Sequence, residues 1–549
     1  MGLLRVFISV IVICLPFRQI TAQDVTAVNG MVASAHPLAT QAGVEILRGG
    51  GNAVDAAVAT ALALAVVEPN ASGLGGGGFM VVRTLDNPDG IVIDYREIAP
   101  RAASADIYYS SDPFKSITGS GYLSVGVPGV PAGLETALKK YGTLNLSDVV
   151  QPALRYAHDG FVVSDKFADM ITLKYELISA YPPTAAIYLQ EGLPPSSGDT
   201  LRNPDLVRTL EEFATDGGEV FYHGQIARLI ETSMQKDGGI FTQQDLANYR
   251  PLIKKPVTGT YRGYQILSVA PPAAGGTHLI ELLNIMEGYD LKKMGHHSAD
   301  YLHHLAEAMK ICLADKDAYM ADPDFEQVPV KQLTAKRYAQ DLREHISPDS
   351  SAFNYQPDTK LLNESGNTTH LSVVDKQGNI VALTQSINFW FGSGITVEGT
   401  GIILNNELAD FASEPDQANS IGPWKRPASN MGPTILLKNG KPFLTIGTPG
   451  GTRIIGALAQ IIINIVDFGM SIDQAIEAPR IHTADGRLHI EDRIPEEVIR
   501  ALETKGHHIQ KHDAFDNYFG GAQGILIDPE NGHMTGGADS RRDGTAMGY

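Results

Sequence analysis

Two adjacent threonines, Thr368 and Thr369, stand where a polar stretch changes abruptly into an alternating apolar one. If the chain were cut before Thr368, that residue would carry both a hydroxyl and a free α-amino group. An α-amino group has an ordinary pKa of about 7.7–8.0, so near neutral pH part of it is unprotonated and can accept the hydroxyl proton. Thr368 is therefore a candidate N-terminal nucleophile that supplies its own general base.

The flanking sequence suits such a nucleophile, but it also fits a plainer interpretation. Residues 345–367 are rich in Ser, Pro, Asp and Asn and show neither helical nor strand periodicity, which gives a newly cut end room to withdraw. The alternating stretch from His370 to Val374 predicts a strand that would hold Thr368 rigidly. Threonine also opens many strands without doing chemistry, and the local pattern alone favours that alternative.

Helices before Thr368 and strands after it would have to position this residue. Ala53 to Val67 is apolar nearly all round, as expected of a helix buried between layers. Downstream, the sequence predicts strands at 370–374 and 380–384, a hairpin of 434–437 with 443–446 around Asn439-Gly440, and a helix at 454–466. Helices and antiparallel strands in one unit predict an α+β fold, with sheets sandwiched between helical layers.

Length and charge limit the class of protein. The 549 residues, 43% of them apolar, can bury a large core, and neither a domain linker nor a repeat divides them. The net charge of -19 leaves no basic stripe for a phosphate backbone, which argues against a nucleic-acid partner. One large unit that acts on small molecules is the expectation.

The first residues resemble an export signal. Arg5 precedes an apolar run from Val6 to Phe17, and a small-residue cleavage site follows at Ala22. This predicts a signal peptide over 1–22 and a periplasmic or secreted protein. The run is roughly 12 residues against the ~20 of a membrane span, so an uncleaved anchor is the weaker alternative. After removal of the signal, Cys312 is the only cysteine, and no intramolecular disulfide is possible.

Two further motifs lack the context that their function requires. Gly73 to Phe79 contains a G-x-G-x-x-G match, but it follows a predicted helix and opens none, which favours a tight glycine turn over dinucleotide binding. His303 and Glu307 would share one helical face, close to three more histidines at 296, 297 and 304. Their spacing matches no familiar ligand set, so solvated or capping histidines are the favoured interpretation.

Seven motifs, in the same order along the chain, resemble those of one known family. They are GMVASAHPLATQAGVEILRGGGNAVDAAVA (30–59), GLGGGGFM (73–80), DYREIAP (94–100), TTHLSVVD (368–375), NNELADF (405–411), KRPASNMGPT (425–434) and GTPGGTRI (447–454). The family is that of the γ-glutamyltransferases, also called γ-glutamyltranspeptidases or glutathione hydrolases, which are self-cleaving N-terminal nucleophile hydrolases. The likeness covers essentially everything after the predicted signal.

The resemblance implies a four-layer αββα sandwich and a cut before Thr368 that yields a large subunit (23–367) and a small catalytic subunit (368–549). Thr368 takes the place of the nucleophile that forms a γ-glutamyl ester, which then passes to water or to an amino acid or dipeptide acceptor. Ser386 falls where the family has a supporting hydroxyl. Gly450 and Gly451 match the oxyanion-hole glycines, and the Asn439-Gly440 hairpin would deliver them on a tight turn.

The same resemblance implies how a γ-glutamyl group would be held. Arg96 matches the arginine that binds the α-carboxylate, for which a planar guanidinium is well suited. Without the family, a surface ion pair with Glu97 or Asp94 would be the default interpretation. Asp410 matches the residue that binds the α-ammonium, with Glu407 and Asn388 beside it. No cofactor or metal is implied for the reaction.

Two positions depart from the family pattern. Where adjacent serines commonly help to bind the carboxylate, this chain has Ser429-Asn430, and the bulkier asparagine changes that contact. The connection from Phe411 to Lys425 is also short, so the protein is predicted to lack the lid loop that some members carry there.

Three functions follow as hypotheses. The first is an exported hydrolase/transferase acting on glutathione and related γ-glutamyl compounds. The second is a glutaryl or cephalosporin-type acylase on the same fold, against which Asp410 argues because a glutaryl group has no ammonium to pair with it. The third is an inactive secreted homologue, against which the joint presence of Thr368, Arg96, Asp410, Gly450 and Gly451 argues.

Overall fold

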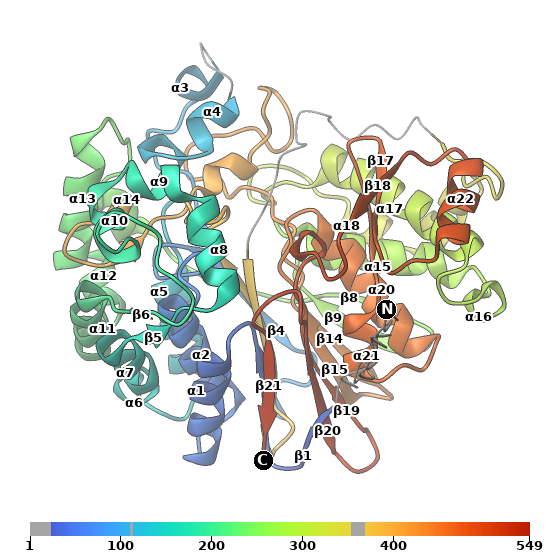
Figure 1. The fold of residues 1–549 in the computed structure, drawn as a ribbon, viewed down its shortest axis with the longest axis horizontal. Coiled ribbons are helices and arrows are strands. Elements are labelled where there is room, and N and C mark those ends of the chain that lie inside the picture. Colours follow the sequence, from blue (N-terminus) through green and yellow to red (C-terminus); the bar gives the residue numbers. More distant parts are fainter. Residues whose placement is uncertain (1–23, 110–113, 353–367) are drawn as a thin grey trace, which may run out of the picture.

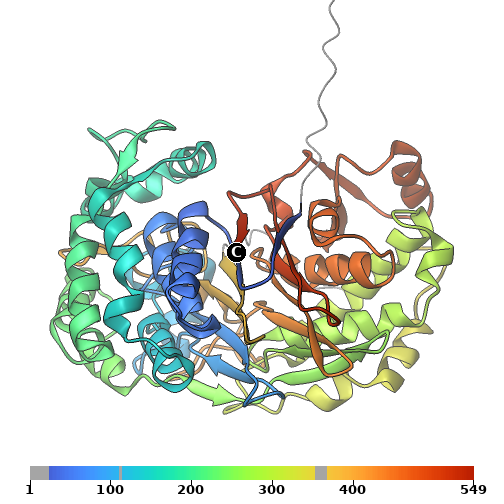
Figure 2. The same ribbon diagram turned by 90° about the horizontal axis from the view of Figure 1, so that it is seen from below.

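The computed structural model describes residues 24–109, 114–352 and 368–549; the predicted signal peptide and Asn367 lie outside them. Two seven-stranded sheets face each other at the centre, and helices cover the outer side of each (Figure 1). The same succession of helix, sheet, sheet and helix is visible from below in Figure 2. The predicted α+β sandwich with four αββα layers is therefore confirmed.

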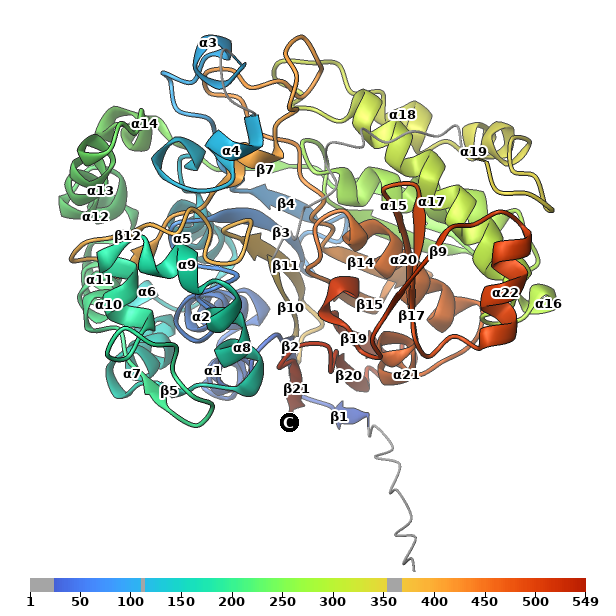
Figure 3. The same ribbon diagram turned by 45° about the horizontal axis from the view of Figure 1, so that its top comes forward.

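Sheet I contains the strand that begins with Thr368, and all its strand pairs are antiparallel. In spatial order it comprises β21 (Thr545–Gly548), β2 (Met31–Ser34), β10 (Thr368–Val374), β11 (Ile380–Ser386), β3 (Gly77–Arg83), β4 (Ile91–Asp94) and β7 (Leu252–Lys254). The central strands β10 and β11 thus have neighbours on both sides, which Figure 3 shows.

Sheet II packs against the inner face of sheet I and is also antiparallel throughout. Its order is β1 (Val25–Ala27), β20 (Met534–Ala538), β19 (Gln523–Ile527), β15 (Lys441–Gly447), β14 (Thr434–Lys438), β9 (Tyr264–Ser268) and β8 (Val257–Tyr261). Strands from both halves of the sequence contribute to each sheet. The two halves therefore could not be separate domains.

Helices complete the two outer layers. Sheet I is covered by α1 (Pro37–Arg48), α2 (Ala53–Val67) and α5 (Val130–Tyr141), with α7 (Gln151–Asp159) and α11 (Pro204–Asp216) packed behind them. Sheet II is covered by α15 (Ala274–Glu287), α20 (Arg453–Val466) and α21 (Ile472–Glu477), with α17 (Ala299–Tyr319) and α22 (Glu496–Thr504) outside. Separate apolar cores fill the space between the sheets and beneath each helical layer.

The predicted elements are present, with small shifts at their ends. Every residue of α2 is buried, as its unbroken apolar sequence requires. Strands β10 and β11 extend beyond the predicted 370–374 and 380–384, because Thr368 still pairs with Ser386 at the end of the ladder. Asn439 and Gly440 adopt φ of 52° and 75°, the left-handed values that a tight hairpin between β14 and β15 needs.

The glycine run after α2 forms a close-packed turn, as predicted. A Cβ on Gly75 would lie 2.0 Å from the carbonyl oxygen of Ile403, and one on Gly76 would lie 1.9 Å from that of Ser386. Only glycine tolerates such an approach of backbone to backbone. The run therefore fixes the end of β11 rather than binding a dinucleotide.

Outside the sandwich, a small sheet of β16 (Ile481–Ala484), β17 (Arg487–Glu491) and β18 (Ile509–His512) follows α21. In the described part of the chain, no helix has both the length and the apolar character needed to cross a membrane.

Candidate active site

Thr368 is the first residue of β10 and lies at one end of a central strand, with only 5% of its surface exposed. Its Oγ1 lies 3.5 Å from the Oγ of Ser386, the residue opposite it on β11. Ser386 Oγ in turn accepts a hydrogen bond of 2.7 Å from the backbone N–H of Asn388. Strand pairing thus fixes the Thr368 backbone, and a second hydroxyl lies beside its side chain.

Thr369 points to the opposite face of sheet I, as alternation along a strand requires. Its hydroxyl donates to Glu68 Oε2 over 2.5 Å. The same carboxylate pairs with Arg542 at 3.3 Å, and Arg542 Nη1 donates to the Thr368 carbonyl oxygen over 2.8 Å. The two threonines therefore have different environments: the Thr369 hydroxyl is committed to a partly buried carboxylate, whereas the Thr368 hydroxyl faces Ser386.

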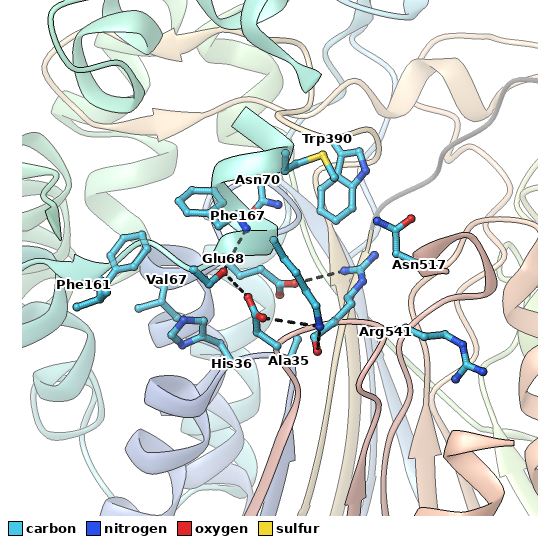
Figure 4. Close-up of a pocket in the computed structure, with 16 residues that line it drawn as sticks. Ala35, His36, Val67, Glu68, Asn70, Phe161, Phe167, Trp390, Asn517 and Arg541 are labelled. Atoms are coloured by element: carbon cyan, nitrogen blue, oxygen red, sulfur yellow. Dashed lines mark hydrogen bonds and ion pairs between the residues drawn. The ribbon is translucent and has the colours of Figure 1, made fainter. Parts of the chain in front are cut away.

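A pocket lies beside this arrangement (Figure 4). Glu68 and Arg542 line it together with Trp390, Phe167, His36 and Asn517. The Arg542 guanidinium lies 4.8 Å from the centre of the Trp390 ring, a cation–π contact.

Burial lowers the pKa of His36 to about 4, although Asp543 opposes the shift, so this histidine is neutral at physiological pH. Sequence reasoning missed Glu68 and Arg542, which lie 301 and 174 positions from Thr369 and Thr368, the residues they hold.

Gly450 and Gly451 lie in the short turn between β15 and α20. Their φ angles of 138° and 55° are in the left-handed region that favours glycine, so a side chain would strain this turn. A Cβ on Gly447, at the end of β15, would come within 2.2 Å of His370 Nδ1 on β10. This close contact brings the turn against the Thr368 strand, and the start of α20 adds the positive end of a helix dipole.

Arg96 is fully buried and lies among carboxylates. Its Nη1 is 2.6 Å from Glu407 and 3.5 Å from Glu97, and its Nη2 is 2.5 Å from Asp410. The backbone carbonyls of Pro427 and Ala428 accept further hydrogen bonds from its Nε and Nη2. The alternative of a surface ion pair with Glu97 or Asp94 is therefore wrong.

Burial and charge act against each other in this cluster. Burial raises the pKa of Glu97 to about 8 and also raises that of Glu407, although Arg96 opposes both shifts. For Arg96 burial would lower the pKa, but the three carboxylates outweigh it and raise the value. The side chain of Asp410 is 19% exposed, against at most 1% for Glu97 and Glu407. Asp410 is thus the carboxylate that a ligand can reach.

Asn388 joins the charged cluster to the Thr368 end of the site. Its Nδ2 donates to Asp410 Oδ1 over 3.2 Å, while its backbone N–H holds Ser386. A φ of 72° lets the one residue face both ways. A chain of contacts therefore runs from Thr368 through Ser386 and Asn388 to Asp410 and Arg96.

Ser429 and Asn430 lie near this cluster but play different local parts. Ser429 is buried, and its Oγ accepts a hydrogen bond from the backbone N–H of Met431. Asn430 lines a pocket with Asp410, Phe411, Asn419, Ala428 and Lys316. Its buried Oδ1 has no hydrogen-bond partner among the described residues. Because a carboxylate accepts hydrogen bonds only, Asn430 could contact one through its Nδ2 amide but not through this oxygen.

The histidines around position 300 differ from their prediction. His303 and His304 are 0% and 7% exposed, and Glu307 is 1% exposed, so these side chains are buried rather than solvated. His303 contacts His507, which comes much later in the sequence, and the helical spacing alone did not reveal this contact.

Comparisons with known proteins agree on one family. The γ-glutamyltranspeptidase family model matches residues 39–549. The glutathione hydrolase proenzyme of Escherichia coli (strain K12) is 42% identical over 545 residues, which cover 96% of this chain and 93% of that protein. The acylase ACY 1 proenzyme of Pseudomonas sp. (strain V22) is 40% identical over 532 residues, which cover 95% and 94%.

The same relationship holds in three dimensions. The crystal structure of a cephalosporin acylase from Bacillus halodurans matches with a TM-score of 0.89 at 32% identity and covers 99% of both chains. The fold and the sequence matches thus confirm the resemblance inferred from the motifs: the chain belongs to the γ-glutamyltranspeptidase family.

Proposed function

We propose that this protein is an exported, self-cleaving γ-glutamyl hydrolase/transferase that acts on glutathione and related compounds. The observation that carries the proposal is the chain of contacts between Thr368 and the Arg96–Asp410 cluster. It links a candidate nucleophile to a site with both a cation and an accessible anion. An α-amino acid group, with its carboxylate and ammonium, is the ligand that such a pair of charges suits.

In this proposal the precursor first cuts itself between Asn367 and Thr368. Thr368 Oγ1 attacks the carbonyl carbon of Asn367, the peptide nitrogen leaves as the new α-amino group, and water hydrolyses the resulting ester. Two chains result, 23–367 and 368–549, once a signal peptide over 1–22 is removed. Ser386, next to Thr368 Oγ1, supports the nucleophile in both stages.

The freed α-amino group then takes the Oγ1 proton as Oγ1 attacks the γ-amide carbonyl of the donor. Backbone N–H groups of Gly450 and Gly451 stabilise the oxyanion, and one such donor is typically worth about 2.7–4 kcal/mol in the transition state. The proton passes to the leaving amine, which departs and leaves a γ-glutamyl ester on Thr368. Water, or the amine of an amino acid or dipeptide, resolves this ester.

Recognition of the donor is divided among the cluster residues. Arg96, with Ser429 and Asn430 nearby, binds the α-carboxylate, and Asp410, Glu407 and Asn388 bind the α-ammonium. The excess of carboxylates over guanidinium groups supports a ligand that brings a positive charge. It also requires the substrate carboxylate to compete with protein carboxylates for Arg96.

A second candidate, a glutaryl or cephalosporin acylase, is supported by the acylases among the similar proteins. We expect kcat/KM of the purified protein to be about 10- to 150-fold higher for a γ-glutamyl anilide than for a glutaryl anilide. This range corresponds to the 1.5–3 kcal/mol that a hydrogen bond to a charged group contributes. Anilide release with each donor measures this ratio. A preference for the glutaryl compound would select the acylase instead.

Analysis of the products formed from the γ-glutamyl anilide tests whether the short connection between Phe411 and Lys425 leaves the site without a lid. Without a lid the Thr368 ester stays open to water, so with a low-millimolar dipeptide acceptor we expect free glutamate to be a major product. A many-fold excess of transfer product over glutamate would contradict the open site.

Arg96→Lys tests the carboxylate assignment. A lysine keeps the charge but loses the planar fork, so we expect KM for the γ-glutamyl donor to rise about 10- to 150-fold, for 1.5–3 kcal/mol of lost hydrogen bonding. Self-cleavage should persist, which the masses of the two chains would show. The exposed Arg101, changed to lysine, is the matched control and should leave KM unaltered. Unchanged kinetics in Arg96→Lys would remove Arg96 from the substrate site.

A further inference from the structure

A second constellation of chemically active side chains lies away from Thr368, between α17 and the segment after α22. His303 and Glu307 are one helical turn apart on α17 and share a face. His507 comes from the turn that follows α22. All three are buried, with exposures of 0%, 1% and 5%. One potential ligand atom from each lies within 4.8 Å of the others.

The hydrogen bonds of His303 determine which of its ring nitrogens is available. Its Nε2 lies 2.7 Å from the Ser347 carbonyl oxygen, which can only accept, so Nε2 carries the proton. In the neutral ring Nδ1 then presents a lone pair, and it lies 2.8 Å from His507 Nε2. A histidine whose outer N–H is anchored on a carbonyl while its inner nitrogen faces a second histidine has the arrangement of a metal ligand.

We propose that His303 Nδ1, His507 Nε2 and a Glu307 carboxylate oxygen bind one divalent transition-metal ion of the zinc type. Two imidazoles and one carboxylate are a ligand set found around zinc, with a water in the fourth position. Imidazole favours Zn²⁺, Co²⁺, Ni²⁺ or Cu²⁺ over Mg²⁺ and Ca²⁺. Bonds of about 2.0–2.1 Å in a tetrahedral site put the two nitrogens roughly 3.3 Å apart, so the rings need to separate by only about 0.5 Å.

Lys310 is the competitor for Glu307. Its Nζ donates to Glu307 Oε1 over 2.6 Å and to Ser351 Oγ over 2.7 Å. Glu307 Oε2 accepts a hydrogen bond of 3.1 Å from the Ala352 N–H. A carboxylate ligates through one oxygen while the other keeps its hydrogen bonds, so Lys310 can remain in place as an outer contact. A pocket lined by Lys310, His507, Ser351, Leu313 and Thr483 adjoins the cluster and leaves room for the water ligand.

The proposed ion would join two parts of the chain that the proposed cleavage separates. His303 and Glu307 belong to 23–367, and His507 belongs to 368–549. Ser347 and Ser351, which contact His303 and Glu307, are near the end of the described part of the larger segment. This consequence rests on the proposed self-cleavage, whereas the metal site itself does not. The reaction proposed for Thr368 does not involve the ion.

Cobalt titration tests the site directly. Metal-free wild-type protein should bind one equivalent of Co²⁺ and develop the visible absorption of tetrahedral cobalt, and an equivalent of Zn²⁺ should abolish that signal. His507→Gln should weaken Co²⁺ binding more than about 100-fold, because even outer contacts of metal sites are worth about 10- to 100-fold. Glu307→Gln should weaken it at least about 10-fold.

The matched control is His512→Gln. His512 and His489 also contact each other at 2.8 Å, with Asp516 and Asp485 on their outer ring nitrogens, but among the described residues no third ligand atom joins that pair as Glu307 joins His303 and His507. Cobalt binding should be the same in this control as in the wild type. Absence of a tetrahedral spectrum in the wild type would overturn the proposal even if the variants failed to fold. So would loss of binding in His512→Gln with retention in His507→Gln.

An uncut Thr368→Ala chain separates this proposal from the proposed function. It should bind Co²⁺ as the wild type does, so failure of self-cleavage would not affect the metal result. In the cleaved wild type, Zn²⁺ should raise the urea concentration at which the two chains separate. No shift with bound Zn²⁺ would refute the joining role.

Discussion

Thr368→Ala is expected to give one uncut chain without detectable γ-glutamyl turnover. The variant lacks the hydroxyl that attacks the Asn367 carbonyl, and without the cut no free α-amino group forms at residue 368. Loss of a nucleophile from a catalytic unit costs about 10⁶-fold in kcat. Intact mass of the purified variant and anilide release measure the two effects.

Two neighbouring variants show whether the effect belongs to the Thr368 hydroxyl. Thr368→Ser keeps a hydroxyl and should still split into two chains. Thr369→Ala removes the donor to Glu68, which costs at most about 1–3 kcal/mol of stability because Glu68 is only partly buried and keeps Arg542 as a partner, and the chain should still cut itself. A Thr368→Ala protein that still splits before residue 368 would disprove the mechanism.

The sequence predicted the strand that carries Thr368 because alternation and turn residues are local signals. It could not predict that the strand begins at Thr368 rather than His370, since that depends on pairing with Ser386 across a turn. Once the strand is known, Thr368 and Thr369 must point to opposite faces, because side chains alternate along a strand. The residues that each threonine contacts could not be predicted, because they come from other parts of the chain.

Long-range partners mark the limit of the sequence argument at the candidate site. Glu68 caps the buried helix α2 and Arg542 lies seven residues before the C-terminus. Nothing local indicates that the two pair with each other or that Arg542 donates to the Thr368 carbonyl. The motifs placed Arg96 and Asp410 in one site by resemblance. Their direct contact, and the burial that makes a surface ion pair wrong, became visible only in the folded chain. His507 was missed beside His303 for the same reason.

Asp410→Asn is expected to reduce kcat/KM for γ-glutamyl donors by about 10- to 150-fold while sparing glutaryl donors, again for 1.5–3 kcal/mol of ionic hydrogen bonding. Asp410 is the most exposed carboxylate around Arg96, so it is the one that an incoming α-ammonium can meet. Asparagine keeps the size and can still face Asn388, but it has no charge. Parallel anilide assays with both donors measure the selectivity.

Asp317→Asn is the matched control, because Asp317 lines the same pocket as Asp410 but pairs with Lys316 rather than Arg96. Removing its charge changes the field in the pocket without touching the cluster. Ion pairs near the surface are worth about 0–1 kcal/mol, so kcat/KM should stay within about five-fold. If Asp410→Asn weakened both donors equally, its effect would lie in the support of Arg96 rather than in ammonium binding. Equal losses of kcat/KM in Asp317→Asn and Asp410→Asn would instead point to the net charge of the pocket. In either case another residue would have to distinguish γ-glutamyl from glutaryl substrates.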